Sequence, residues 1–122
     1  MKKRVIAITG GNSGIGLAIS KLFLENGYKV AVFAQSIERL EEFRKKAPSD
    51  IFIFSGDVSS IYDVENFYKQ CAKLWGGIDT VIANAGIALP EPLSDVTEDS
   101  FDKSININLV SLCQFESFSL KF

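Results

Sequence analysis

Four short runs, three of them wholly apolar and the fourth apolar after an initial threonine, divide the chain into alternating segments. The runs cover Val5–Ile8, Val30–Ala34, Ile51–Phe54 and Thr80–Ala83, and polar or periodic stretches separate them. A continuous apolar run of this length predicts a strand that is covered on both faces of a parallel sheet. Four such strands alternating with helices predict an α/β fold with a doubly wound parallel sheet.

The segment behind the first run has the pattern of an amphipathic helix. Its apolar residues recur at helical spacing, and Asn26-Gly27 supplies a stop signal after them. The stripe that we expect to face the sheet consists of Ile15, Ala18, Ile19, Leu22 and Phe23.

Capping residues mark the next two helices. Ser36 is expected to cap a charged helix over Ile37–Lys46. Ser60 and Asp63 form a capping-box pattern at the start of a helix that ends near Trp75.

The chain beyond Gly86 changes character. Ala88–Pro92 is expected to be irregular because it holds two prolines, and Thr97 is expected to cap a further helix with acidic residues in its first turn. The apolar stripe of that helix is Phe101, Ile105, Leu109 and Leu112.

The composition favours one globular domain, with 47% hydrophobic residues, 23% charged residues and a formal net charge of −2 in 122 residues. It offers no basic surface for nucleic acid, so no nucleic-acid partner is expected. The first apolar run breaks at Thr9-Gly10, too early for a signal peptide, and no stretch is long enough to cross a bilayer. We therefore expect a cytoplasmic protein without a membrane partner.

The chain contains no histidine and only two cysteines, Cys71 and Cys113, which have no metal or redox spacing. Without histidine, the chain lacks a common zinc ligand and the base that the Ser-His-Asp and Cys-His routes of nucleophilic catalysis require. We therefore expect no metal site, and we interpret both cysteines as reduced, mostly structural thiols.

The segment Thr9–Gly16 is the clearest candidate for a ligand-binding loop. It has the sequence Thr-Gly-Gly-Asn-Ser-Gly-Ile-Gly and joins the first strand to the first helix. Glycines at such a junction allow a tight turn and let backbone N–H groups approach a diphosphate at the positive end of the helix. An ordinary strand-to-helix turn is the alternative, because glycine also serves there without a ligand. The context of a βαβ unit favours dinucleotide binding.

Four motifs in this order resemble the N-terminal half of the short-chain dehydrogenases/reductases. They are Thr9–Gly16, Asp57-Val58, Asn84-Ala85-Gly86 and Ile107-Asn108-Leu109. The resemblance runs from about Lys3 to Leu109, so we expect an NAD(P)-binding half-domain over residues 1–109 and an atypical tail over residues 110–122. It implies a Rossmann-type doubly wound parallel sheet that is truncated after the fourth strand and the helix that follows it.

The resemblance implies a role for each matching residue. Asn108 is implied to orient a water in the proton relay that serves the catalytic Tyr and Lys of the family. The glycines line the pyrophosphate, Ile15 packs under the nicotinamide end, Asp57 and Val58 meet the adenine, and Asn84, Ala85 and Gly86 flank the cofactor. The residues implied to bind the cofactor are Gly10, Asn12, Ser13, Gly14, Ile15, Gly16, Ala34, Gln35, Asp57, Val58, Asn84, Ala85 and Gly86.

Some of these residues have plainer explanations. Asp57 fits an ordinary turn after a strand, and Asn84 fits a turn that tolerates a left-handed residue. Asn108 has poor helix propensity and neighbours apolar Leu109, so on the sheet-facing side it would need a buried partner. This favours a functional role for Asn108.

The end of the second strand normally selects the cofactor. An acidic residue there accepts hydrogen bonds from the ribose of NAD, whereas an arginine accommodates the extra phosphate of NADP. This chain has Ala34, Gln35 and Ser36 instead, with Arg39 as a weaker candidate nearby. We therefore expect NADP or NAD, with a slight preference for NADP.

The Tyr-x-x-x-Lys pair of the family is missing from these residues. The three tyrosines, Tyr28, Tyr62 and Tyr68, are followed four positions later by Val32, Asn66 and Ala72. We therefore expect a truncated or frame-shifted product of an oxidoreductase that, when complete, transfers hydride between an alcohol and a carbonyl. A catalytically inactive dinucleotide-binding module and a functionless remnant are the alternatives. Self-association is expected, because truncation would expose the apolar edge of the fourth strand.

Overall fold

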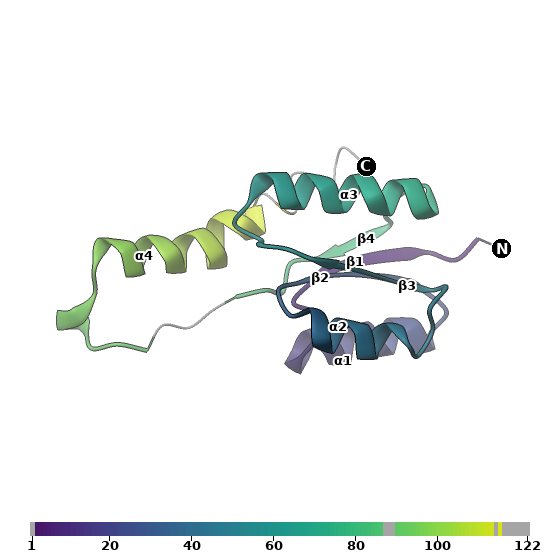
Figure 1. Ribbon diagram of the computed structural model, residues 1–122, viewed down its shortest axis with the longest axis horizontal. Coiled ribbons are helices and arrows are strands. Elements are labelled where there is room, and N and C mark those ends of the chain that lie inside the picture. Colours follow the sequence, from purple (N-terminus) through teal and green to yellow (C-terminus); the bar gives the residue numbers. More distant parts are fainter. Residues whose placement is uncertain (1, 87–89, 114, 116–122) are drawn as a thin grey trace.

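The computed structural model describes residues 2–86, 90–113 and 115. Within these residues, four parallel strands form a sheet in the order β3-β2-β1-β4 (Figure 1). They are β1 (Val5–Thr9), β2 (Lys29–Ala34), β3 (Ile51–Ser55) and β4 (Thr80–Ile82). Each strand coincides with a predicted apolar run to within one residue at either end.

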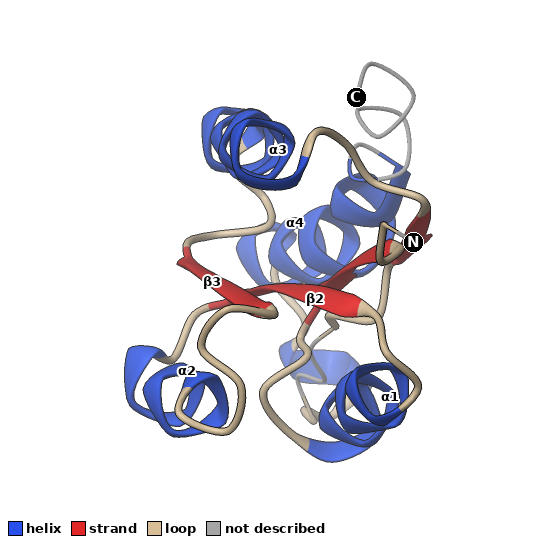
Figure 2. Cartoon of the chain, turned by 90° about the vertical axis from the view of Figure 1, so that its right-hand side faces the viewer, coloured by secondary structure: helices blue, strands red, loops and turns tan. Residues whose placement is uncertain are grey.

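Helices cover both faces of this sheet (Figure 2). α1 (Gly14–Glu25) and α2 (Ile37–Arg44) lie on one face, and α3 (Ile61–Trp75) lies on the other. The apolar runs form strands because both faces are covered: residues 5–8 and 30–33 are at most 2% exposed. The Rossmann-type doubly wound arrangement expected from the sequence is therefore confirmed.

The core on the α3 face is largely aromatic. Phe67 packs edge-on against Phe33, with ring centroids 5.4 Å apart, and stacks on Phe115 at 5.9 Å. Tyr68 donates a hydrogen bond of 2.7 Å from its hydroxyl to the Phe115 carbonyl oxygen. Phe115 is 1% exposed although it belongs to the segment expected to be an atypical tail. Its ring completes the core between the sheet and α3.

The predicted apolar stripe of α1 is wrong in part. Ile15 and Leu22 are 75% and 58% exposed, whereas the buried residues of the helix are Gly16 and Ser20. The first turn of the helix lies so close to the glycine loop that no side chain fits there: a Cβ on Gly16 would stand 2.1 Å from the Gly10 carbonyl oxygen.

Larger residues of α1 pack at the sides of this close contact. Ile19 and Phe23, two members of the predicted stripe, pack partly buried against the core formed by β1, β2 and α2. Leu17 and Leu24, outside that stripe, pack there as well. The inner face of the helix is therefore rotated relative to the predicted one.

The caps of the middle helices follow the prediction only in part. Ser60 accepts a hydrogen bond from the Asp63 backbone N–H at 3.4 Å, as in a capping box. The Asp63 carboxylate, however, accepts from the backbone N–H of Asp57 at 2.9 Å rather than returning to Ser60. Ser36 makes no side-chain capping bond, and α2 ends at Arg44, two residues before the predicted end.

The chain beyond β4 passes through a short 3₁₀ turn, η1 (Leu93–Asp95), into α4 (Glu98–Ile105). α4 is followed by a π-helical turn, η2 (Asn106–Val110). Thr97 caps α4 as predicted, and its partner in the capping box is Ser100: the Thr97 side chain accepts from the Ser100 N–H at 3.1 Å.

The predicted stripe of this last helix does not form a core. Phe101 and Leu109 are 57% and 55% exposed, and Ile105 is 36% exposed. α4 extends away from the sheet, so this apolar face has no sheet beneath it (Figure 1). Helical spacing correctly predicts an amphipathic helix, but it cannot show whether another element lies against the apolar side chains.

Parts of two expectations lie outside the described residues: the irregular conformation at Ala88 and Leu89, and most of the tail after Cys113. No helix in the described ranges is long and apolar enough to cross a membrane.

Candidate functional site

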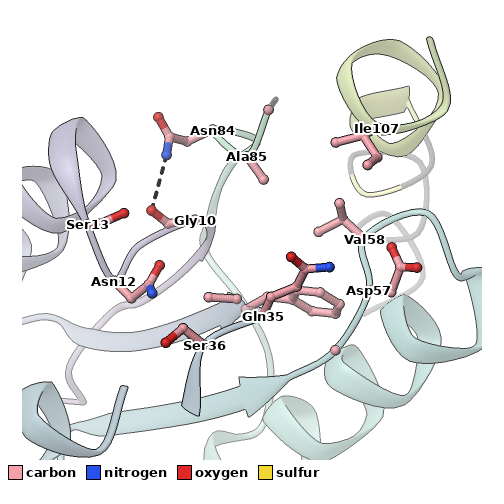
Figure 3. Close-up of a pocket in the computed structure, with 14 residues that line it drawn as sticks. Gly10, Asn12, Ser13, Gln35, Ser36, Asp57, Val58, Asn84, Ala85 and Ile107 are labelled. Carbon is pink, nitrogen blue, oxygen red and sulfur yellow. Dashed lines mark hydrogen bonds between the residues drawn. The ribbon is translucent and has the colours of Figure 1, made fainter. Parts of the chain in front are cut away.

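A cavity of about 340 Å³ opens at the carboxyl ends of β1, β2 and β4 (Figure 3). The chain runs from β1 to β2 on one side, while β4 pairs with β1 on the other, so this is the point where the strand order reverses. Ligands of open α/β sheets bind at such a point. The lining residues are Gly10, Asn12, Ser13, Phe33, Ala34, Gln35, Ser36, Gly56, Asp57, Val58, Asn84, Ala85, Gly86 and Ile107.

Thr9 fastens the two loops that form one side of the cavity. Its hydroxyl oxygen accepts hydrogen bonds from the backbone N–H groups of Asn84 and Ala85, both at 3.0 Å. Asn84 in turn donates from Nδ2 to the Gly10 carbonyl oxygen at 3.3 Å (Figure 3). Gly10 has φ +69°, and a Cβ there would lie 3.1 Å from Asn84 Nδ2. The glycine loop and the loop after β4 are thus joined at Gly10, where the positive φ and the close Asn84 amide both favour glycine.

The N-terminus of α1 borders this cavity through its N-cap residue, Ser13. Ser13 caps the helix in an extended conformation without a side-chain bond, and the first turn contains no acidic residue. The first N–H groups of any helix lack partners within it and carry the positive end of its dipole. A Cβ on Gly14 would meet nothing within 4 Å, so the backbone there is open to approach. These features fit a diphosphate.

The loop after β3 holds Asp57 in a defined position. Asp57 Oδ1 accepts hydrogen bonds from the backbone N–H and the hydroxyl of Ser59, at 2.9 and 2.7 Å. Its own N–H donates to Asp63 Oδ2 at 2.9 Å, and its carbonyl accepts from the Ser60 N–H at 3.0 Å. Asp57 and Val58 line the cavity opposite Asn84 and Ala85 (Figure 3).

The end of β2 forms the floor and rim. The backbone carbonyls of Phe33 and Ala34 accept from the N–H groups of Gly10 and Gly56, at 2.8 and 3.1 Å. Ala34 is buried while Gln35 is exposed. Neither residue carries a charge, so the rim is neutral at the position where an acidic residue would indicate NAD binding.

A second cavity, of about 410 Å³, lies on the other side of the glycine loop. Lys21, Arg39 and Lys46 line it together with residues 12–14, and Glu42 is its acidic member. Arg39, expected to be a weak candidate, thus lies beside the glycine loop rather than on a remote surface.

Asn108 does not occupy the predicted buried position. It lies in η2 and is exposed, and its Nδ2 donates to Ser104 Oγ at 3.3 Å. Its Oδ1 lies toward Gly86, since a Cβ on that glycine would be 3.0 Å away from it. The π-helical turn presents Ile107 to the cavity instead. Asn108 therefore lies beside the loop after β4, outside the cavity lining.

Most of the predicted cofactor residues line the cavity, and three do not. Gly14 lines the second cavity, Gly16 is buried beneath the loop, and Ile15 is exposed rather than packed. The residues that sequence reasoning missed are Phe33, Ser36, Gly56 and Ile107. Each of these is adjacent in sequence to a predicted residue, which is the signal that could have found them.

The two cysteines differ in their surroundings. Cys71 is buried in the α3 core, where desolvation raises the pKa of its thiol to about 12, whereas Cys113 is exposed. The interpretation of both as structural thiols therefore fits Cys71 alone. No group of three potential metal ligands occurs among the described residues.

Comparison with known proteins gives a consistent result. A cis-2,3-dihydrobiphenyl-2,3-diol dehydrogenase of Paraburkholderia xenovorans is 38% identical over 114 residues, which is 89% of this chain and 41% of the relative. An uncharacterised oxidoreductase of Listeria monocytogenes is 37% identical, covering 89% of this chain and 45% of the relative. A crystal structure described as a short-chain dehydrogenase/reductase, glucose/ribitol dehydrogenase, from Brucella melitensis superposes with a TM-score of 0.92 at 29% identity, over 99% of this chain and 54% of that one.

The chain spans about half the length of these relatives. The sequence model of the short chain dehydrogenase family matches residues 4–119, which extends past Leu109, where the motif resemblance was expected to end. With its parallel sheet, glycine loop and this match over nearly all of its residues, the chain belongs to the short-chain dehydrogenase family and has the NAD(P)-binding fold of that family.

Proposed function

We propose that this chain is the NAD(P)-binding part of a short-chain oxidoreductase that interconverts a small alcohol and its carbonyl compound. The cavity at the carboxyl ends of β1, β2 and β4 carries this proposal, because it combines the N-cap of a helix without first-turn acids with a fixed carboxylate and apolar walls. A bound nicotinamide supplies or accepts the hydride. The residues of this chain hold and orient that cofactor.

Each part of the cavity suits one part of a dinucleotide. The N–H groups at residues 14–16 would bind the diphosphate, with the polar side chains of Asn12 and Ser13 at the side of the loop. Asp57 would accept a hydrogen bond from the adenine amino group, while Val58 and Ile107 would contact the faces of the base.

The nicotinamide end would lie against the loop after β4. Asn84, Ala85 and Gly86 line that side of the cavity and are held to β1 by the Thr9 hydroxyl. Asn108 would act next to them, by orienting a water for proton transfer to the substrate oxygen. The proximity of its Oδ1 to Gly86 supports this placement.

Hydride transfer to a carbonyl also needs a proton donor. No tyrosine in these 122 residues has a lysine four positions later. In the proposed enzyme, the Tyr-Lys pair lies in the part of the relatives' length that these residues do not span.

A preference for NADP is the finer part of the proposal. The neutral rim at Ala34 and Gln35 has no carboxylate to repel a 2′-phosphate. Arg39 and Lys21 line the neighbouring cavity beside the glycine loop and would supply positive charge to it. Guanidinium groups form strong paired hydrogen bonds with phosphate.

A non-catalytic dinucleotide-binding module is the second candidate function. The observation that favours it is the cavity lining, whose groups suit the binding of a dinucleotide by themselves. Binding of cofactor without any turnover of alcohols or carbonyls would select this function over the first.

Isothermal titration with NADPH and NADH tests the binding proposal. The variant Gly14→Asp places a carboxylate beside the diphosphate, so it should abolish binding. Gly27→Asp is a matched control, because Gly27 also has a positive φ (+83°) and open space but lies at the far end of α1. Binding by the wild type and Gly27→Asp but not by Gly14→Asp supports the site. No binding by a folded wild-type chain would refute it.

We also propose that the chain self-associates and resides in the cytoplasm. Among the described residues β4 pairs with β1 alone, so its other edge offers unpaired backbone groups. The exposed apolar face of α4 and η2, with Phe101 in α4 and Leu109 in η2, adds a surface that a second copy would cover. Light scattering after size exclusion should give a mass above 13.4 kDa, and a monodisperse monomer would contradict this.

A further inference from the structure

The loop that carries Asp57 is tied to the first turn of α3 by a single side chain. Asp63 Oδ2 accepts the Asp57 backbone N–H at 2.9 Å. The Asp63 backbone N–H is held in turn by Ser60 Oγ at 3.4 Å, so the carboxylate extends from the capped end of the helix. Asp63 is only partly exposed and does not itself line the cavity.

The surroundings of Asp63 leave its carboxylate little freedom. A Cβ on Gly56 would lie 3.0 Å from Asp63 Oδ2 and 2.8 Å from the Phe54 ring. Gly56 follows β3 and lines the cavity. The carboxylate therefore fits against a backbone segment that has no side chain, and this close approach brings it to the Asp57 N–H.

The bonds around Asp57 determine which of its atoms can meet a ligand. Its N–H is taken by Asp63, its carbonyl by the Ser60 N–H, and its Oδ1 by Ser59. Among bonds between described residues, none involves Oδ2. Asp57 lines the cavity, so Oδ2 is the oxygen that remains to accept a donor from a base.

We propose that Asp63 is a positioning residue for base recognition: its carboxylate fixes the Asp57 backbone so that Asp57 Oδ2 accepts the exocyclic amino group of adenine. This inference rests on the proposed dinucleotide function and deepens it. The contribution of Asp63 is a hydrogen bond to the loop and not a contact with the cofactor. Asp63 therefore determines how well the site distinguishes adenine from a base that has no amino group at the same position.

The test compares two cofactors that differ at that amino group. The probes are NADPH and reduced nicotinamide hypoxanthine dinucleotide phosphate, in which a carbonyl oxygen replaces the amine. Dissociation constants are measured by titration calorimetry for the full chain and for Asp63→Ala, Asp63→Asn and Ser60→Ala. Thermal unfolding of each variant is recorded in parallel.

The wild type should bind NADPH more tightly than the hypoxanthine analogue. Asp63→Ala should weaken NADPH binding about tenfold, a loss typical of one charge-assisted hydrogen bond, and should weaken the analogue much less. Asp63→Asn should retain most of the preference, because an amide oxygen still accepts the Asp57 N–H. Ser60→Ala should lower the melting temperature through loss of the cap but retain most of the preference, because the Asp63 carboxylate and the Ser60 N–H still hold Asp57.

Three results would overturn the assignment. One is equal weakening of both ligands in Asp63→Ala, which is what a merely structural role produces. Another is a wild type that binds both ligands equally, because Asp57 would then not recognise the amino group. A folded wild type that binds neither ligand would refute the dinucleotide function itself, and the assignment with it.

Hydrogen exchange provides a readout that does not depend on the folding of Asp63→Ala. The Asp57 amide lies in an exposed loop, yet the bond to Asp63 predicts slow exchange in the wild type and in Asp63→Asn. Exchange at the rate of an unprotected loop amide would contradict the proposed role.

Discussion

Replacement of Phe115 by alanine should destabilise the whole domain. The Phe115 ring is 1% exposed and contacts the rings of Phe67, at 5.9 Å, and Tyr68, at 5.0 Å. Truncation of a buried Phe to Ala typically costs about 3–5 kcal/mol. The hydrogen bond from Tyr68 to the residue 115 carbonyl involves only backbone at that position, so it survives the substitution. The loss therefore measures the ring, and we expect roughly 3 kcal/mol or more.

Urea unfolding followed by circular dichroism measures this loss. With a slope of about 2 kcal/mol per molar urea, the midpoint should fall by roughly 1.5 M. Phe101→Ala is the matched control: Phe101 also lies beyond β4 but is 57% exposed, so its replacement should change stability by less than about 1 kcal/mol. Equal small effects of the two substitutions would refute the assignment of Phe115 to the core.

Three further predictions concern the site and its thiols. Thr9→Val removes the hydroxyl that accepts two backbone N–H groups, so it should lower the free energy of unfolding by about 2–4 kcal/mol and the melting temperature by roughly 8–15 °C. Thr9→Ser keeps the hydroxyl and should retain most of this stability. Equal stability of the two variants would contradict the role of the Thr9 hydroxyl in joining the two loops. Arg39→Ala should weaken NADPH binding about tenfold in calorimetry and leave the affinity for NADH nearly unchanged. Lys45→Ala is the control for loss of a surface charge. Equal effects on the two cofactors would argue against recognition of the 2′-phosphate by Arg39. At pH 8, Ellman's reagent should label Cys113 rapidly in the native protein and Cys71 only after unfolding, because burial raises the pKa of the Cys71 thiol to about 12. Rapid labelling of both thiols in the native protein would contradict this.

The burial of Cys71 also predicts how stability changes in alkali. An ordinary thiol has a pKa of 9.0, and the folded state raises that of Cys71 to about 12. The folded state therefore retains a proton that the unfolded state loses. This contribution to stability is fully present below pH 9 and decreases as the pH rises from 9 toward 12.

Sequence alone predicts the sheet well, for a physical reason. β1 and β2 are covered on both faces, so their apolar runs are uninterrupted and their boundaries are clear. The ends of these strands also carry the site, since the carboxyl ends of parallel strands share one edge. Motifs such as Asp57-Val58 and Asn84-Ala85 therefore line one cavity although they are far apart in sequence.

Sequence predicts helix faces less well when packing is unusually close. The inner face of α1 contains Gly16 and Ser20, whose small size permits the helix to approach the glycine loop closely, and hydrophobic periodicity cannot detect such residues. In α4 and η2 the periodicity is present, but Phe101 and Leu109 have no sheet beneath them. Periodicity describes a helix and not its surroundings.

The role of a polar side chain depends on which partner it reaches. Ser60 and Asp63 have the spacing of a capping box, and that spacing correctly predicted the start of α3. It could not show that the Asp63 carboxylate would reach Asp57 instead of Ser60. Phe115 was missed in a similar way, because an unusual local sequence gives no sign of a long-range aromatic contact.

The central claim is that the cavity at the carboxyl ends of β1, β2 and β4 binds a nicotinamide dinucleotide. The most direct measurement is an NMR titration of the ¹⁵N-labelled chain with NADPH. The account predicts saturable shifts at the amides of residues 10–16, 35–36, 57–58 and 84–86. Shifts confined to the opposite edge of the sheet, near Lys2 and Trp75, or no shifts from a folded chain, would contradict it.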